Sequence, residues 1–449
     1  MTQLIAKNNV VVLIGMGLSG RSAARYLLAT DQLFVWLDTR KNPPGLSDIK
    51  NEFPSVNFEL GALNQDTLLD AAQIIVSPGV SLATPEIAAA KKAGIEVIGD
   101  VELFLREAKA PVVAITGSNA KSTVTMLVGE MARDAGINVA VGGNIGIPVL
   151  DLLGADGVDL YVLELSSFQL ETIEQVNAEV ATVLNVSEDH MDRYDSLFHY
   201  HLAKQRVYYG AKTVVTNRQD PLTVPPIAEG VKQLTFGLNQ PDRKGFGLLQ
   251  KGGESWLAYE FKALMPCSKI RMPGRHNIAN ALSALALGYA VDIPMETMLD
   301  TLTHFSGLPH RCEWVAESNG VTFFNDSKGT NVGATLAAIN GLKTDGKKIV
   351  LIAGGVGKGA DFTPLAQVSD ELRSVVLIGE DAQKIAQVFE SNCNVEFASS
   401  MNEAVNRSKA LAKTGDTVLL SPACASFDMY EGFEARGQAF IDAVKEASK

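Results

Sequence analysis

Short runs of apolar and β-branched residues alternate with segments of helical periodicity along almost the whole chain. This alternation restricts the fold more than any other feature, because a strand, a helix and a second strand return in parallel to the same sheet. The predicted strands are at 10–14, 34–37, 74–76, 112–116, 160–165, 180–185, 348–353, 375–378 and 417–420. The clearest predicted helices are at 121–135, 277–290 and 331–339. The sequence therefore predicts an α/β protein built on parallel sheets.

Two breaks in this pattern indicate three domains, which is also what a length of 449 residues allows at about 150 residues each. An acidic helical stretch precedes a new strand near residue 111, and the turn cluster SGLP precedes new β-type sequence at 310. We expect domains at 1–100, 101–307 and 308–449. Residues 218–275 are rich in Gly, Pro and polar residues, which predicts a small antiparallel unit inside the central domain.

The bulk charge limits the possible partners. A formal net charge of -12 and a pI near 5.1 argue against binding to nucleic acid or to an anionic membrane surface, since both would repel the chain. The four cysteines form no C-x-x-C pair, and the first apolar run is short and leads into glycines, as in a buried strand rather than a signal peptide. We expect a cytoplasmic protein with no membrane insertion.

The motif GMGLSG follows the first predicted strand and opens a helix, and Asp38 ends the next strand. This spacing matches the dinucleotide-binding fingerprint. Physically, the motif provides a tight turn and a helix N-terminus that can bind a diphosphate. The diphosphate of a nucleotide sugar could bind there as well as that of a dinucleotide. A nicotinamide cofactor, a UDP-type ligand and a purely structural turn all remain open at this point, with Asp38, Thr39 and Arg40 as a polar edge for a base or ribose.

The stretch TGSNAKST, residues 116–123, resembles a phosphate loop in which Ala120 stands where glycine usually precedes the lysine. Its backbone N–H groups and Lys121 would hold phosphates, and Ser122 would sit where Mg²⁺ binds. Glu164 ends another apolar strand, a position from which an acidic residue helps to hold Mg²⁺. The alternatives are an accidental Lys-Ser-Thr at a helix start and a solvated carboxylate at a strand end.

Three further motifs follow predicted strands. NVSEDHMDRY at 185–194 brings His190 together with carboxylates, which suits a cation site or simply a capped helix start. NDSKGTNVGA at 325–334 carries Lys328, which could stabilise an oxyanion or belong to a surface loop. SPACASFDMYEGFEARG at 421–437 turns from a strand into a helix and could bind a carboxylate near Ser426.

Taken together these motifs resemble the Mur ligases, the ATP-dependent amide-forming enzymes of peptidoglycan precursor synthesis. The similarity extends over the whole chain in order and includes GMGLSG, SPG, TGSNAKST, GGNIG, ELSSFQLE, NVSEDHMDRY, HYHLAKQRVY, GRHNIANALSA, GLPHRCEWV, NDSKGTN, AGGVGKGADF and SPACASFDMYEGFEARG. It is greatest to the member that adds D-glutamate to UDP-N-acetylmuramoyl-L-alanine. The chain lacks the D-N-P-R tetrapeptide of the diaminopimelate-adding members. The resemblance implies Rossmann-like first and last domains around a phosphate-loop ATPase-type central domain.

The resemblance also assigns residues. For the UDP end of the first substrate it implies Leu18, Ser19, Asp38, Thr39, Arg40 and Gly79, with Asn144 near the acceptor carboxylate. For ATP it implies Gly117, Ser118, Asn119, Ala120, Lys121, Ser122, Thr123, Asn280, Arg311 and Asp326. For two Mg²⁺ ions it implies Ser122, Glu164, His190 and Lys204, the last as a carbamate. For the two carboxylates of D-glutamate it implies Thr330, Lys358, Ser426, Phe427 and Phe433.

The implied chemistry activates a carboxylate by phosphoryl transfer from ATP and then lets an amine displace phosphate. Lys121, Glu164, His190, Lys204 and Lys328 are the expected catalytic residues, and a monomer is expected. A folylpolyglutamate-type ligase would share the central domain but would have no use for GMGLSG. A nicotinamide dehydrogenase would leave Lys121 and the NDSKGTN motif without a role.

Ala120 carries a separate expectation. A left-handed conformation would cost alanine about 1 to 2 kcal/mol, and its methyl group would need room beside the phosphates. We therefore expect a negative φ at Ala120, with its Cβ turned away from the ATP site.

Overall fold

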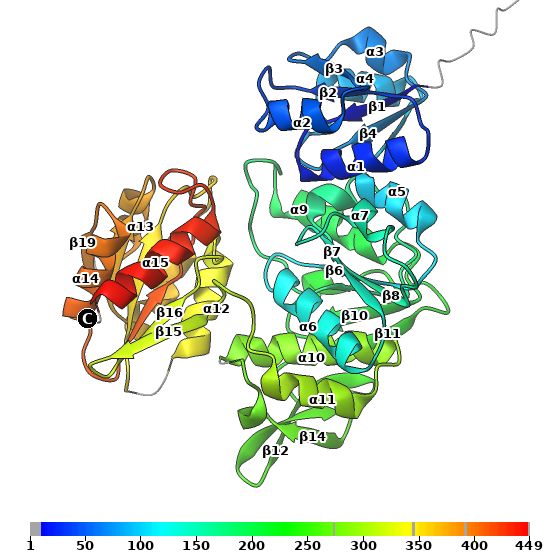
Figure 1. Cartoon of the computed structure of the whole chain (residues 1–449). Coiled ribbons are helices and arrows are strands. Elements are labelled where there is room, and N and C mark those ends of the chain that lie inside the picture. Colours follow the sequence, from blue (N-terminus) through cyan, green and yellow to red (C-terminus); the bar gives the residue numbers. More distant parts are fainter. Residues whose placement is uncertain (1–9, 273, 344–345, 390–392, 448–449) are drawn as a thin grey trace, which may run out of the picture.

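The computed structural model describes residues 10–272, 274–343, 346–389 and 393–447. Three sheets follow one another along the chain, with five, nine and six strands. Figure 1 shows the first unit in blue stacked on one end of the cyan and green central unit, and the third unit in yellow and red beside it. The predicted α/β class and the three-unit organisation are confirmed.

The first unit is a parallel sheet in the order β3-β2-β1-β4-β5. Its strands are β1 Val11–Ile14, β2 Phe34–Asp38, β3 Asn57–Leu60, β4 Gln73–Val76 and β5 Glu96–Ile98. Its helices are α1 Leu18–Ala29, α2 Leu46–Glu52, α3 Gln65–Leu69 and α4 Pro85–Lys92, and α5 Asp100–Glu107 follows the last strand. β2 and β3 lie on one side of β1, and β4 and β5 lie on the other. Because the strand order reverses between β1 and β4, a crevice opens at their carboxyl ends.

The central sheet has the order β14-β13-β12-β11-β10-β9-β6-β8-β7. Its strands are β6 Val112–Thr116, β7 Val139–Gly143, β8 Leu160–Glu164, β9 Val180–Val183, β10 Thr213–Asn217, β11 Lys232–Phe236, β12 Gly245–Lys251, β13 Glu254–Tyr259 and β14 Lys262–Pro266. Its α-helices are α6 Lys121–Asp134, α7 Val149–Leu152, α8 Ser167–Leu170, α9 Leu197–Gln205, α10 Arg275–Ala290 and α11 Met295–His304. Short 3-10 helices lie at Arg206–Tyr208, Pro221–Thr223 and Cys267–Lys269.

The antiparallel unit predicted for 218–275 is present as β12, β13 and β14. Gly252 and Gly253 both have positive φ and close the β12–β13 hairpin, as a two-residue hairpin turn requires. These strands continue the central sheet, because β11 pairs in parallel with both β10 and β12. The predicted unit is thus the edge of the large sheet.

The third sheet has the order β15-β16-β20-β17-β18-β19, in which only the β15–β16 pair is antiparallel. Its strands are β15 Glu313–Ser318, β16 Val321–Asn325, β17 Ile349–Gly354, β18 Leu372–Ile378, β19 Asn394–Phe397 and β20 Thr417–Leu420. Its helices are α12 Val332–Leu342, α13 Ala382–Phe389, α14 Met401–Leu411 and α15 Phe433–Ala447, with a 3-10 helix at Thr363–Glu371. The loops after β16, β17 and β20 leave the sheet side by side.

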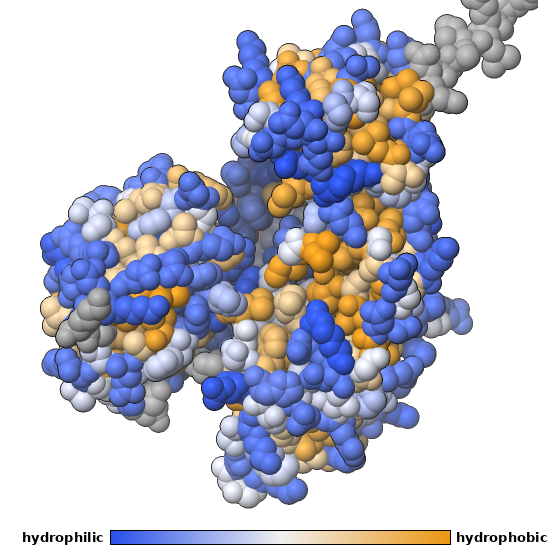
Figure 2. All heavy atoms as spheres, in the orientation of Figure 1, coloured by the Kyte–Doolittle hydropathy of each residue, from blue (hydrophilic) through white to orange (hydrophobic). Residues whose placement is uncertain are grey.

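The first and central units share one apolar cluster, which α5 and α7 join. Phe104 of α5 meets Tyr161 of β8 edge to face at 4.9 Å. The third unit contacts the central one through polar side chains and through α12, which lies against α10. Figure 2 shows the molecule hollowed between the third unit and the rest. The domain limits at 100/101 and 307/308 fall between sheets and stay predictions.

The backbone of Ala120 differs from the expectation. Its φ is +66°, so the prediction of a negative φ is wrong. The residue is the N-cap of α6, and the loop must reverse direction within a few residues between β6 and that helix. Ala120 lies half-buried against the apolar cluster beneath α6. The tertiary packing of the loop thus overrides the local steric preference of alanine.

Replacing Ala120 with glycine should therefore relieve strain. We expect Ala120→Gly to raise the free energy of unfolding by up to about 1 kcal/mol, because the left-handed penalty of about 1 to 2 kcal/mol exceeds the entropic cost of glycine. Urea denaturation measures this. Ala135→Gly is the matched control at the other end of α6, where φ is -81°, and it should lower stability. If both variants were less stable than wild type, the conclusion that Ala120 is strained would be wrong.

Candidate active site

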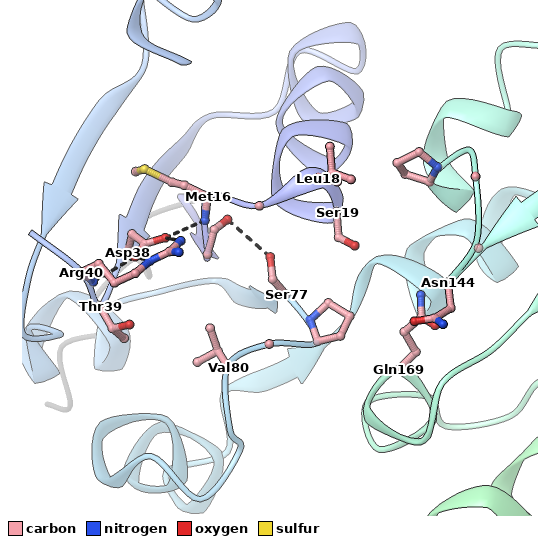
Figure 3. Close-up of a pocket in the computed structure, with 17 residues that line it drawn as sticks. Met16, Leu18, Ser19, Asp38, Thr39, Arg40, Ser77, Val80, Asn144 and Gln169 are labelled. Atoms are coloured by element: carbon pink, nitrogen blue, oxygen red, sulfur yellow. Dashed lines mark hydrogen bonds and ion pairs between the residues drawn. The ribbon is translucent and has the colours of Figure 1, made fainter. Parts of the chain in front are cut away.

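A cavity of about 600 Å³ lies at the carboxyl ends of β1, β2 and β4, facing the loop after β7 (Figure 3). We call it the β1 cavity. All six residues predicted for the UDP end line it, together with Asn144, predicted near the acceptor carboxylate: Leu18, Ser19, Asp38, Thr39, Arg40, Gly79 and Asn144. Gly20 allows α1 to approach β1 closely, because a Cβ there would lie 1.9 Å from the Gly15 carbonyl oxygen. The motif GMGLSG thus forms one wall of a cavity large enough for a nucleotide.

Asp38 is buried and positions Arg40. Its two oxygens accept hydrogen bonds from Nε and Nη2 of Arg40 at 2.8 and 2.7 Å, and from the Met16 N–H at 2.8 Å. Burial opposes ionisation of the carboxyl, but the hydrogen bonds from Arg40 and Met16 outweigh it, and the pKa of Asp38 is lowered. With both oxygens occupied, Asp38 supplies no free acceptor to the cavity, and Arg40 presents the polar edge instead (Figure 3).

Asp100 lies behind this cavity, and the motif analysis missed it. It begins α5, is 3% exposed, and its Oδ1 has no hydrogen-bond partner within the described residues. Burial raises its pKa to about 6, and a hydrogen bond with Ser19 of the β1 cavity moderates the rise. A single Asp at a helix start carries no sequence signal that would have distinguished it from an ordinary cap.

The phosphate loop joins β6 to α6 and is held from two sides. The Ser118 hydroxyl donates to the Ser187 carbonyl at 2.9 Å, and the Asn119 N–H donates to Asn185 Oδ1 at 2.8 Å. Lys121 folds back, with Nζ 2.9 Å from the Gly117 carbonyl and 3.0 Å from that of Ser118. Burial lowers the pKa of Lys121, although the carboxylate of Glu164 works in the opposite direction. The loop therefore presents a desolvated amine.

Glu164 has one satisfied and one unsatisfied oxygen. Oε1 accepts a hydrogen bond from Asn144 at 2.7 Å, whereas Oε2 is buried without a partner within the described residues. The side chain is 2% exposed, and an orphaned carboxylate oxygen at such a depth is costly unless a cation or donor reaches it. Glu164 and the Ser122 hydroxyl line the same cavity, and both are oxygen donors of the kind that Mg²⁺ prefers.

Lys204 of α9 is almost fully buried at 1% exposure. Its Nζ donates to the Gly117 carbonyl at 2.8 Å and lies 4.3 Å from the centre of the Tyr200 ring. Burial, followed by the nearby charge of Lys121, lowers its pKa well below the usual value. A neutral amine is the nucleophilic form of lysine, so the environment fits the carbamate predicted for this residue.

His190 and Asp189 lie beside these groups. His190 has a left-handed φ of +58°, its ring meets Phe168 at 4.9 Å, and burial lowers its pKa. Burial opposes ionisation of Asp189, but the charges of His190, Lys358 and Lys121 outweigh it, so its pKa is lowered. No group of three His, Cys, Asp or Glu side chains in the described ranges could hold a metal alone. A metal here needs mixed ligands, such as Ser122 or a modified lysine.

A cavity of about 510 Å³, which we call the central cavity, collects most of the predicted catalytic and D-glutamate residues. It contains Ser118, Asn119, Ala120, Lys121, Ser122, Asn144, Glu164, His190, Arg311, Lys328, Thr330, Lys358, Ser426, Phe427 and Phe433. Lys328 lies 3.7 Å from the centre of the Phe433 ring, and burial lowers its pKa to about 8. Lys358 pairs with Asp189 at 3.5 Å, which links the third unit to the central one.

A third cavity of about 320 Å³ lies against α10 and is called the α10 cavity. Its lining includes the predicted ATP residues Asn119, Ala120, Thr123, Asn280, Arg311 and Asp326. Arg311 donates to the Ser122 hydroxyl at 2.7 Å across the unit boundary. Burial raises the pKa of Asp326 to about 6, although a hydrogen bond from Ser421 opposes the rise. His276 also lines this cavity and was not predicted, since its motif had been assigned through Asn280 alone.

The structure thus brings together nearly all the predicted residues. Gly117 and Lys204 line none of these three cavities, but they are joined to the central cavity through the Gly117 carbonyl, which accepts from both Lys121 and Lys204. Asn331, which caps α12, was missed and bridges the units by donating to Asn119 Oδ1 at 3.1 Å and Asp189 Oδ2 at 3.2 Å. Among the described residues no helix is long and apolar enough to cross a membrane.

Comparison with known families agrees with this arrangement. The Mur ligase MurD-like N-terminal domain matches residues 8–99, the Mur ligase middle domain matches 115–288, and the Mur ligase glutamate ligase domain matches 310–424. UDP-N-acetylmuramoylalanine--D-glutamate ligase of Pseudomonas syringae pv. tomato is 55% identical over 444 residues, covering 98% of this chain and 99% of its own. The enzyme of the same name from Saccharophagus degradans is 51% identical over 455 residues, with full coverage of both chains.

Solved structures show the same fold at low sequence identity. A pseudomurein peptide ligase type C from Methanothermus fervidus has a TM-score of 0.61 at 18% identity, covering 98% of this chain and 100% of its own. UDP-N-acetylmuramate-alanine ligase from Thermotoga maritima has a TM-score of 0.60 at 18% identity, covering 97% and 99%.

Asp100 makes the stability of the protein depend on pH. Because its pKa in the folded state, about 6, lies above the ordinary value of 3.8, its contribution is fully present below pH 4 and is lost as the pH rises through 6. Asp100→Asn should remove this loss. We therefore compare the free energy of unfolding of the variant with that of wild type at pH 4.5 and at pH 7.5, by urea denaturation. The difference should be more favourable to the variant at pH 7.5 by about 1 to 3 kcal/mol. The exposed control Asp156→Asn should show the same change of stability with pH as wild type. If the stability of Asp100→Asn also changed with pH as wild type does, Asp100 would not be the source of the pH dependence.

Proposed function

Because the chain belongs to the Mur ligase family, we propose that it adds D-glutamate to UDP-N-acetylmuramoyl-L-alanine with hydrolysis of ATP to ADP and phosphate, a step of peptidoglycan precursor synthesis. The observation that carries this proposal is that three cavities adjoin one another through shared lining residues. Asn144 lines both the β1 cavity and the central cavity, and Arg311 and Lys328 line both the central and the α10 cavity. Three substrates bound in these cavities would meet at Lys121.

The reaction needs activation because an amine does not displace oxide from a carboxylate. In the first step a carboxylate oxygen of the L-alanyl group attacks the γ-phosphorus of ATP, the bond to the β-phosphate oxygen breaks, and ADP leaves. In the second step the neutral amine of D-glutamate attacks the carbonyl carbon of the acyl phosphate. The tetrahedral intermediate expels phosphate, and the amine loses a proton, which gives the amide.

Lys121 serves the first step in this proposal. Its amine, now bound to two carbonyls of its own loop, would turn to the γ-phosphate when ATP enters. The phosphates would also meet the N–H groups of residues 120–123, where the positive end of α6 points. Asn280, Arg311 and Asp326 would contact the adenine, phosphate and ribose in the α10 cavity.

Two magnesium sites fit the donors present. Ser122 and Glu164 would hold one ion, and the unpartnered Oε2 of Glu164 supports this. His190 and a carbamate on Lys204 would hold the other, and the buried amine of Lys204, whose pKa is lowered well below its usual value, supports the modification. Magnesium ions would supply charge neutralisation on the transferring phosphoryl group.

D-glutamate has two carboxylates, and two groups of residues on the central cavity suit them. Thr330 and Lys358 would bind one, and Ser426 with the backbone near Phe427 and Phe433 would bind the other. Lys328 would face the oxyanion of the tetrahedral intermediate, where a buried ammonium stabilises developing negative charge.

The UDP end of the first substrate would occupy the β1 cavity, with Leu18, Ser19, Asp38, Thr39, Arg40 and Gly79 around it. This assignment favours a uridine diphosphate over a nicotinamide cofactor for GMGLSG. We further propose that the protein acts as a monomer in the cytoplasm.

Phosphate release tests the substrate assignment. With ATP, Mg²⁺ and UDP-N-acetylmuramoyl-L-alanine, we expect D-glutamate to stimulate release, while L-glutamate, L-alanine and diaminopimelate do not. A lack of D-glutamate-dependent release would refute the proposal. Oxidation or reduction of a nicotinamide, followed by absorbance, would instead favour a dehydrogenase.

Lys204→Ala tests the carbamate. We expect phosphate release to fall by about a hundredfold or more, because a metal ligand would be lost, and to recover partly with added acetate or propionate, which restore a carboxylate in the vacated space. Lys212→Ala, at an exposed lysine of the same unit, is the control and should keep full activity. Full activity of Lys204→Ala would exclude a catalytic carbamate.

A further inference from the structure

Arg436 is a buried arginine that neither the motif analysis nor the mechanism above uses. It lies in the first turn of α15 and is 1% exposed. Within the described residues it forms four hydrogen bonds, all to uncharged oxygens, and takes part in no ion pair. A buried cation without a paired carboxylate is unfavourable unless its donors are well satisfied. The position of those acceptors therefore shows what this arginine does.

The acceptors come from three loops. Nε donates to the Ser327 hydroxyl at 3.0 Å, and Nη2 donates to the carbonyls of Ser327 at 2.9 Å and Cys424 at 3.0 Å. Nη1 reaches the Gly354 carbonyl at 3.5 Å. These loops follow β16, β20 and β17, which are neighbours in the sheet. One rigid planar guanidinium thus joins the carboxyl ends of three adjacent strands.

Each of these loops carries a side chain of the central cavity. Lys328 directly follows Ser327, Ser426 lies two residues after Cys424, and Lys358 lies four residues after Gly354. The Ser327 hydroxyl, which accepts from Arg436, itself donates to the Phe433 carbonyl at 2.8 Å. A shift of the guanidinium would therefore change the spacing of all three side chains together.

The loops also contain backbone strain that requires support. Lys358 and Ala423 have left-handed φ values of +52° and +58°. Non-glycine residues keep such conformations only where surrounding contacts fix them. The loops contact one another through the paired backbones of Val356 and Ala425, and Arg436 adds a clamp from beneath.

We propose that Arg436 is a positioning residue that sets the spacing of Lys328, Lys358 and Ser426 and thereby the affinity for D-glutamate. This inference rests on the proposed placement of D-glutamate in the central cavity. Arg436 itself touches no substrate. Its loss should therefore weaken D-glutamate binding while leaving the site for the UDP-linked substrate, which none of these three loops lines, nearly unchanged. ATP binding should weaken less than D-glutamate binding, because Asp326 next to Ser327 lines the α10 cavity but most of that lining comes from the central unit.

Steady-state kinetics of the full-length enzyme test the proposal. We expect Arg436→Met to raise the KM for D-glutamate about tenfold or more, with the KM for ATP raised less and the KM for the UDP-linked substrate within about twofold of wild type. Arg436→Lys keeps a donor that can reach part of the acceptor set, so it should raise the KM for D-glutamate less. If Arg436→Met does not fold, Arg436→Lys decides by the same measurement.

Phe440→Leu is the matched control for lost packing. Phe440 lies one turn further along α15 and is fully buried in the apolar cluster beneath the sheet. It should lower the melting temperature without a selective change in the KM for D-glutamate. The proposal is overturned if the KM for D-glutamate stays at the wild-type value in both Arg436 variants. It is also overturned if the KM values for D-glutamate and for the UDP-linked substrate rise together.

Lys358→Ala and Ser426→Ala separate this inference from the proposed function. If they raise the KM for D-glutamate and the Arg436 variants do not, only the positioning role fails. If they leave it unchanged, the placement of D-glutamate in the central cavity fails, whatever the Arg436 variants show.

Discussion

The carbonyl oxygen of Gly117 accepts hydrogen bonds from two buried lysines, Lys121 at 2.9 Å and Lys204 at 2.8 Å. Two ammonium groups cannot share one carbonyl in a desolvated site at low cost, so burial and mutual repulsion favour a neutral amine at Lys204. The turn from β6 to α6 creates this arrangement, because it aims the carbonyl at α9. The chemistry proposed for the site follows from it: a cation for phosphate at Lys121, and a nucleophilic amine at Lys204.

The three units depend on contacts around the same loop. Arg311 reaches Ser122, and Asn331 reaches both Asn119 and Asp189, so the third unit is bound to the loop that would hold the phosphates. These contacts are polar, whereas the first and central units share an apolar cluster. Polar contacts exchange readily with water and ligands. A ligand at the phosphate loop would therefore influence the place of the third unit more than that of the first.

The sequence predicted the fold class and the membership of the site well, for different reasons. Strand and helix periodicity identified the parallel layers, because burial on both faces leaves nearly continuous apolar strands such as β6 and β17. The site residues came from motifs and resemblance. Asp100 was missed because an isolated Asp has no pattern of its own. Asn331 and Arg436 lie inside quoted motifs, but nothing in those motifs showed which partners their side chains reach. Ala120 was predicted wrongly because its steric preference was weighed without the surrounding loop.

By itself the sequence determined which segments form strands and helices, and which motifs stand at the strand ends, since both follow from local periodicity and from short-range turn chemistry. Only the tertiary structure decided the φ of Ala120, the orphaned oxygen of Glu164 and the convergence of three loops on Arg436. The reason is physical. Burial, strain and hydrogen bonding in these places arise between residues far apart in the chain, and their energies exist only once the three sheets have packed together.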